Sequence, residues 1–262
     1  MRHALSIEYS GDGYSGWQQQ AGVISIQEVL QNAISKVANA PISVVCAGRT
    51  DRGVHACAQI VHFDTTSERE PSAWVRGVNQ YLPKTVRVLA HYSVSEDFHA
   101  RFSASSRLYR YVFYHREVSS AILHKQVRYC RFKLDLDRMN QALAWLIGEH
   151  DFSAFRASGC QAKSPVRTVS CAKAYRCGDF SVVEIQANAF LYHMVRNIIG
   201  TLLPIAKGEK DPLFLKEILE GKNRQLAPAT APYDGLYLVG IEYPEAFSIP
   251  FNQQGPVFLA DG

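Results

Sequence analysis

The sequence predicts an α+β fold, and two observations lead to this class. Short apolar segments that alternate with polar residues recur along the chain, which is typical of half-buried, antiparallel strands. Segments with helical spacing of apolar residues are fewer than these strands. The two halves, residues 1–104 and 105–245, also have a similar make-up. We therefore expect two similar α/β subdomains that share a mainly antiparallel sheet.

The first half begins with a strand, followed by a capped helix. Ser25 and Glu28 form a capping box at the start of this helix. Its apolar face consists of Ile26, Val29, Leu30, Ala33, Ile34 and Val37. A second helix is expected from Pro71, which suits a first turn, to about Tyr81. Strands are expected at residues 2–9, 42–47, 58–64 and 86–91.

The second half repeats this mixture of strands and helices. One helix is expected to begin with a cap at Asp137 and to end at Gly148, and another begins at Asp211 and ends at Gly221. Residues 193–206 predict a buried helix between them. Strands are expected at residues 107–115, 126–132, 167–176, 180–187 and 236–241. After Pro244 the chain becomes rich in proline and glutamine, which predicts a surface tail at residues 246–262.

Composition limits the classes of protein to which the chain can belong. It has 262 residues, of which 47% are hydrophobic, enough for a sizeable core. The sequence contains no run of about 18 apolar residues, so no membrane span is predicted. The N-terminus enters a strand pattern without a signal peptide, so we expect a cytoplasmic protein. The net charge of +4 permits a nucleic-acid partner without requiring one.

The sequence also lacks the common metal and nucleotide motifs. Its six cysteines are scattered without zinc-ligand spacing, which predicts free thiols in a reducing compartment. No H-E-x-x-H, P-loop or G-x-S-x-G motif is present. Residues 11–16 do spell G-x-G-x-x-G, but the next helix starts only at Ser25. A dinucleotide site needs the last glycine to open a helix, so we reject that interpretation.

A charged turn between two predicted strands is the strongest local feature. Residues 47–57 carry Arg49, Asp51, Arg52 and His55 between apolar segments. Taken alone, a solvated hairpin loop with Asp51 capping the turn is the simpler interpretation. A functional site is the alternative, because function concentrates on loops that a rigid scaffold holds.

Two further segments combine charge with apolar or aromatic residues. Residues 98–111 interleave aromatic residues with arginines, which suits either RNA binding or a strand with arginines outside. Residues 190–200 place Arg196 in an apolar helix, where it is either a snorkelling cation or the partner of an anion.

Four segments, in order along the chain, resemble motifs of the tRNA pseudouridine synthase A family. Residues 48–56 closely resemble its G-R-T-D-x-G-V-H-A signature. Residues 9–20 resemble Y-D-G-x-x-Y-x-G-W-Q-x-Q, with Ser10 in place of the usual aspartate. Residues 98–111 resemble F-H-A-R-F-S-A followed by a Y-R-Y strand, and residues 190–200 resemble F-x-x-H-M-V-R-N-I-x-G.

This resemblance assigns roles to individual residues. It implies that Asp51 is the catalytic nucleophile and that Arg49 helps to flip the target base. It also implies that Tyr109 lies against the uracil and that Arg196 pairs with Asp51. The residues that it assigns to tRNA binding are Arg69, Phe98, His99, Ala100, Arg101, Phe102 and Lys163.

The resemblance further implies a pseudouridine synthase fold with the helices packed on one side of the sheet. The expected reaction is the isomerisation of uridine at positions 38, 39 and 40 in the anticodon arm of tRNA. It needs no cofactor and no metal, since no group is oxidised or carried in. The expected assembly is a homodimer, and no membrane is involved. Two alternatives remain: a non-catalytic RNA-binding protein on the same fold, and a pseudouridine synthase for another RNA.

Overall fold

The computed structural model describes residues 1–251, 253 and 255–259. Within these residues the chain forms two compact units. The first unit consists of Met1–Arg107 and the described residues of Tyr237–Pro256, and the second consists of Leu108–Leu236 and the described residues from Val257 onward. The strand that follows Leu236 thus belongs to the first unit, although it comes late in the chain.

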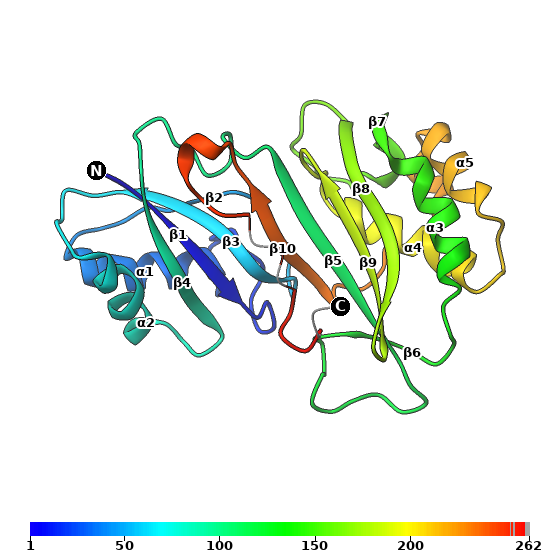
Figure 1. Cartoon of the computed structure of the whole chain (residues 1–262), viewed down its shortest axis with the longest axis horizontal. Coiled ribbons are helices and arrows are strands. Elements are labelled where there is room, and N and C mark those ends of the chain that lie inside the picture. Colours follow the sequence, from blue (N-terminus) through cyan, green and yellow to red (C-terminus); the bar gives the residue numbers. More distant parts are fainter. Residues whose placement is uncertain (252, 254, 260–262) are drawn as a thin grey trace. The chain divides into compact units, whose positions relative to one another are not determined.

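The first unit is built on a mostly antiparallel group of strands (Figure 1). Their order is β4–β1–β3–β10, and β2 pairs with β3. Strand β1 is antiparallel to β3 and β4, whereas β10 is parallel to β3. Helix α1 packs against α2, and α2 with the π-helical turn before it packs against β4. The bounds are β1 Arg2–Tyr9, α1 Ile26–Ala38, β2 Val45–Cys46, β3 His55–Asp64, α2 Val78–Tyr81, β4 Val86–Val94 and β10 Leu236–Glu242.

The second unit also combines a group of strands with helices (Figure 1). Its strand order is β5–β9–β8–β7, with β6 parallel to β5. Helix α3 packs on β8 and contacts α4 and α5. The bounds are β5 Ser106–His115, β6 Arg128–Cys130, α3 Leu136–Leu143, β7 Gly148–Asp151, β8 Val166–Cys177, β9 Phe180–Ala187, α4 Met194–Ala206 and α5 Leu213–Gly221.

Each unit has its own aromatic core. The largest buried rings of the first unit are Trp17, Phe63, Trp74 and Phe98. Those of the second unit are Tyr111, Phe113, Phe152 and Phe155. Mostly antiparallel strands and a smaller number of helices in both units confirm the predicted α+β class.

The structure corrects several details of the predicted elements. The cap of α3 is Asp135, whose side chain accepts the N–H of Arg138 at 3.0 Å, and not Asp137, which lies in the first turn. Helix α3 ends at Leu143, and Gly148 begins strand β7, which was not predicted because its residues, Gly-Glu-His-Asp, have no apolar alternation. Strand β3 starts at His55, so the charged turn is shorter than expected.

Candidate active site and nucleic-acid interface

The charged turn presents Asp51 from a tightly held backbone. The N–H of Val54 donates to the carbonyl of Asp51 at 3.1 Å, and Gly53 takes the positive φ of 77° that closes the turn. Thr50 and Val54 are buried on either side, whereas Asp51 itself is half-buried and Arg49 is exposed. Asp51 is therefore only partly covered, while its neighbours anchor the loop.

A buried polar network fixes the first part of this loop. The Gln59 side chain on β3 accepts the Gly48 N–H at 3.3 Å and donates to the Gly48 carbonyl at 2.5 Å. Its amide nitrogen also donates to Tyr9 Oη at 3.4 Å, and Tyr9 Oη bonds to Thr50 Oγ1 at 2.7 Å. Burial raises the pKa of Tyr9 well above its ordinary value, so the phenol stays neutral. Gln59 was not predicted as part of the site, although a glutamine inside an apolar strand is a signal for such a network.

The glycine-rich N-terminal motif packs directly against the loop. The N–H of Trp17 donates to the Thr50 carbonyl at 3.0 Å, and the N–H of Gly11 donates to His55 Nδ1 at 3.1 Å. A Cβ on Gly11 would lie 2.2 Å from the Val54 carbonyl oxygen. The glycines thus allow backbone to approach backbone, which is a different use from holding a pyrophosphate.

The segment from Phe98 to Phe102 forms an exposed tip on a buried base, which we call the basic tip. Phe102 is 75% exposed, its ring lies 4.3 Å from that of His99, and the Arg101 guanidinium lies 5.4 Å from its centroid. Phe98 and Ala100 are fully buried, so their side chains support the tip and do not reach its surface.

Two histidines hold the backbone of the basic tip as hydrogen-bond acceptors. His62 Nδ1 accepts the Ala100 N–H at 3.1 Å, and His99 Nδ1 accepts the N–H groups of Arg101 and Phe102 at 3.2 Å each. Burial lowers the pKa of His62 to about 4 and also lowers the pKa of His99. Both rings are therefore neutral near pH 7, as an acceptor nitrogen requires.

Arg107 joins the basic tip to the start of the charged turn. Its side chain is buried, and it donates to the carbonyl oxygens of Ala104 at 3.0 Å, Ala47 at 3.1 Å and Arg101 at 2.5 Å. The Cys46 thiol has its pKa raised to about 12 by burial, and Arg49 and Arg101 both oppose that shift. Both cations thus lie within electrostatic range of one thiol, close to the loop of Asp51.

Arg69 lies elsewhere in the first unit. Its Nε donates to the Val37 carbonyl at 3.2 Å, near the C-terminal end of α1. The charged turn is tied to the other end of this helix through Trp17, whose N–H bonds to Thr50. The Trp17 carbonyl accepts the N–H of Gln27 at 3.0 Å. Ten residues of helix separate these two contacts by about 15 Å along its axis.

The remaining predicted site residues belong to the second unit. Tyr109 is buried and packs edge-on against Phe190, with ring centroids 4.9 Å apart. Arg196 is half-buried on the first turns of α4, and its Nε donates to the Ala231 carbonyl at 2.8 Å. Lys163 is exposed on a loop that Arg156 braces.

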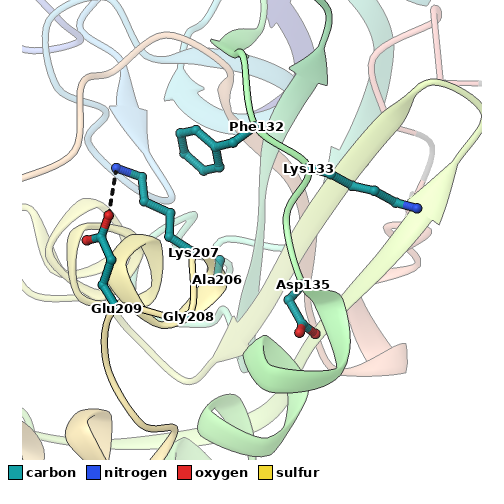
Figure 2. A pocket seen from close by; sticks show the side chains of 7 residues that line it. All are labelled: Phe132, Lys133, Asp135, Ala206, Lys207, Gly208 and Glu209. Carbon is teal, nitrogen blue, oxygen red and sulfur yellow. Dashed lines mark ion pairs between the residues drawn. The ribbon is translucent and has the colours of Figure 1, made fainter.

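Two surface hollows in the described part of the chain are lined by none of the predicted site residues. Figure 2 shows one of about 520 Å³ in the second unit, where the ion pair of Lys207 and Glu209 (3.7 Å) lies beside Phe132 and Asp135. Another, of about 560 Å³, lies over residues 19–24 of the first unit.

Within the described residues, no three His, Cys, Asp or Glu side chains group closely enough to hold a metal ion. The six cysteines are free thiols. Each helix in the described part of the chain is too short or too polar to cross a membrane.

Comparison with known proteins gives strong matches over nearly the whole chain. The family model described as tRNA pseudouridine synthase matches residues 5–112 and 142–244. A protein of Colwellia psychrerythraea named tRNA pseudouridine synthase A is 49% identical over 99% of this chain and 100% of its own length. A protein of Pseudoalteromonas atlantica with the same name is 52% identical over 100% of this chain and 99% of its own. A solved structure of a Cbf5-Nop10-Gar1 complex is 12% identical over 78% of this chain and 53% of that chain, and its TM-score of 0.31 is too low to support any argument.

Proposed function

The chain belongs to the tRNA pseudouridine synthase family, and from this premise we propose that it isomerises uridine to pseudouridine at positions 38, 39 and 40 of the tRNA anticodon arm. As a member of this family it is an isomerase. The observation that carries the assignment is the loop of Asp51. Asp51 is half-buried, and contacts from β1, β3 and the N-terminal glycine motif hold its loop at Gly48 and Thr50.

The reaction needs no redox partner. The N1–C1′ bond breaks, the uracil turns, a C5–C1′ bond forms, and the hydrogen of C5 leaves as a proton while N1 gains one. Atoms and electrons balance within the nucleotide, so the residues must supply only a carboxylate and a closed site. A carboxylate can attack C1′, add to the uracil ring or remove the C2′ proton, and we assign to Asp51 the role of nucleophile.

The other residues of the site receive supporting roles. Arg49 is exposed two residues before Asp51, where it would fill the space that a flipped base leaves. Tyr109 would cover the uracil face. Arg196 would be the counter-charge that keeps the nucleophile ionised. Asp51 and Arg196 belong to different units, so their pairing stays a prediction and is tested by mutation below.

The RNA interface combines phosphate and base contacts. Arg101 and Phe102 offer a cation and an exposed ring at the basic tip, with His99 behind them. Such pairs suit the phosphates and unpaired bases of an anticodon loop. We assign phosphate contacts to Arg69 and Lys163, and a supporting role to Phe98 and Ala100. We also propose that the protein works as a homodimer in the cytoplasm.

The test is an isomerisation assay on unmodified tRNA. Transcripts with a single anticodon-arm uridine at position 38, 39 or 40, tritiated at C5, release tritium when C5 bonds to C1′. The wild type should release it without any added cofactor. Asp51→Asn should abolish release with tRNA affinity and thermal stability retained, and Asp179→Asn, at an exposed turn of the second unit, is the matched control.

Normal turnover by Asp51→Asn contradicts the assignment of the nucleophile. Binding of tRNA by the wild type without any tritium release favours the non-catalytic alternative. Release from other RNA stem-loops, but not from these transcripts, favours a synthase for another RNA.

A further inference from the structure

The segment between α5 and β10 folds around one guanidinium group. Arg224 Nη1 donates to the carbonyl oxygens of Ala227 and Pro228 at 3.0 Å each. Its Nη2 donates to Thr230 Oγ1 at 3.0 Å and to Asn197 Oδ1 at 3.1 Å. Arg224 therefore closes this segment on itself and fastens it to α4.

The acceptor on α4 is held in one orientation. Asn197 is fully buried, and its Nδ2 donates to the Phe155 carbonyl at 2.7 Å. Its Oδ1 consequently faces the segment, where it also accepts the Thr230 hydroxyl at 2.6 Å. A flipped amide would lose all of these bonds, since it would oppose donor to donor and acceptor to acceptor.

The backbone of the segment then lies directly on α4. A Cβ on Gly200, one turn after Asn197, would come within 2.2 Å of the Ala229 carbonyl oxygen. Ala231, two residues after Ala229, donates its N–H to the Arg196 carbonyl at 3.1 Å. Its own carbonyl accepts the N–H of Arg196 Nε at 2.8 Å. A bond at Nε restricts the orientation of a planar guanidinium group.

We propose that Arg224 is a positioning residue for the reaction, because it shapes the segment through which Ala231 holds the Arg196 guanidinium. This inference rests on the role of Arg196 in the proposed function. Lysine at position 224 would keep the charge, but one ammonium cannot reproduce four hydrogen bonds in a planar fork. The effect of Arg224→Lys should therefore appear in the rate of the chemical step and not in RNA affinity.

The experiment compares Arg224→Lys with a matched control in the full-length protein. The control is Arg138→Lys, because Arg138 braces the other end of α4 through the carbonyls of Ile205 (3.3 Å) and Lys210 (2.7 Å). Three quantities are measured for each variant: the single-turnover rate of tritium release, the Kd for tRNA, and the pH profile of the rate. Thermal melting shows that each variant folds.

Arg224→Lys should lower the single-turnover rate about tenfold or more, since displacements of this kind cost catalysis steeply, and leave the Kd within about threefold. The acidic limb of its pH profile should move toward higher pH, in the same direction as in Arg196→Met. The double variant should be no slower than Arg196→Met alone. Arg138→Lys should match the wild type.

A folded Arg224→Lys variant with a normal rate overturns the inference, as does a loss that adds fully to that of Arg196→Met. If Arg224→Lys does not fold, Thr230→Val decides. It removes, at nearly constant volume, the hydroxyl that accepts from Arg224 and donates to Asn197. A normal rate then overturns the inference. A normal rate for Arg196→Met refutes the proposed role of Arg196 itself. The two failures are therefore distinguishable, because they appear in different variants.

Discussion

Gly16 is the position at which a single methyl group should disturb the loop of Asp51 most selectively. It has a φ of +94°, and an added Cβ would lie 2.9 Å from the Thr50 carbonyl oxygen and 3.1 Å from the Asp51 carbonyl carbon. Gly13 is a matched control within the same motif. Its φ is +83°, but in the described part of the chain nothing lies within 4 Å of its Cβ position. Gly16→Ala and Gly13→Ala therefore share the backbone strain and differ in contact with the loop.

The expected magnitudes follow from this geometry. A positive φ costs alanine about 1–2 kcal/mol in either variant, which lowers the melting temperature by roughly 2–8 °C in a chain of this length. In Gly16→Ala, the Thr50 peptide must also move by about 0.5 Å to restore an ordinary contact of 3.4 Å. Because a misplacement of about 1 Å can cost a hundredfold in rate, a shift of about half that size should cost roughly tenfold.

The assay is single-turnover tritium release by both variants, with thermal melting and tRNA affinity measured in parallel. Gly16→Ala should lose roughly tenfold in rate, whereas Gly13→Ala should stay within about twofold of the wild type. Equal rates in the two folded variants would show that the N-terminal motif does not position the loop of Asp51 for the reaction. A loss confined to tRNA affinity would assign the motif to RNA binding instead.

Four further outcomes are expected. Arg196→Met should slow the chemistry far more than it weakens tRNA binding. The acidic limb of its pH–rate profile should move to higher pH, because loss of a neighbouring cation raises the pKa of a carboxylate. An unchanged pH profile contradicts this role. EDTA should leave the rate unchanged wherever the tRNA stays folded, and recovery by zinc after a loss would contradict acid–base chemistry without a metal. The slope of log affinity for tRNA against log salt concentration should become shallower by about 0.7–0.9 in Arg101→Met. An unchanged slope removes Arg101 from the interface. Arg69→Met tests the distant end of α1 in the same way. The pKa of His99 is lowered from its ordinary value of 6.5. The order of the basic tip is therefore present above pH 6.5 and is lost as the pH falls through the lowered pKa. Amide hydrogen exchange at Phe102 measures this order, and a loss of protection already above pH 6.5 refutes the prediction.

Periodicity predicted most of the elements because their packing follows from local patterns. Strand β1 and helix α1 with its Ser25 cap lie where alternation and helical spacing place them. Strand β7 escaped prediction because its four residues carry no apolar alternation and are held by pairing with β8. The cap of α3 was misplaced by two residues, since Asp135 and Asp137 are equally good caps in sequence and only the backbone conformation separates them.

The family motif assigns roles to Asp51 and Arg49, and those roles stay predictions. The supports of their loop were not predictable from the sequence. The bonds that hold their loop come from Tyr9 and Gln59, which are separated by 50 residues, and no local pattern relates them. The interpretation of residues 98–111 as a strand with arginines outside also failed for Arg107, which is buried and bonds to three carbonyl groups.

The G-x-G-x-x-G pattern shows why spacing alone is a weak guide to function. Its first and last glycines are required because Gly11 lies against the Val54 carbonyl and Gly16 against the Thr50 carbonyl. These two contacts bracket Asp51 from one side, and the bonds of Gln59 to Gly48 hold the same loop from another. The glycine motif and the motif that carries Asp51 are therefore two sides of one interface. The glycine motif has the spacing of a nucleotide-binding motif because both uses bring backbone into close contact, and only glycine leaves room for that contact.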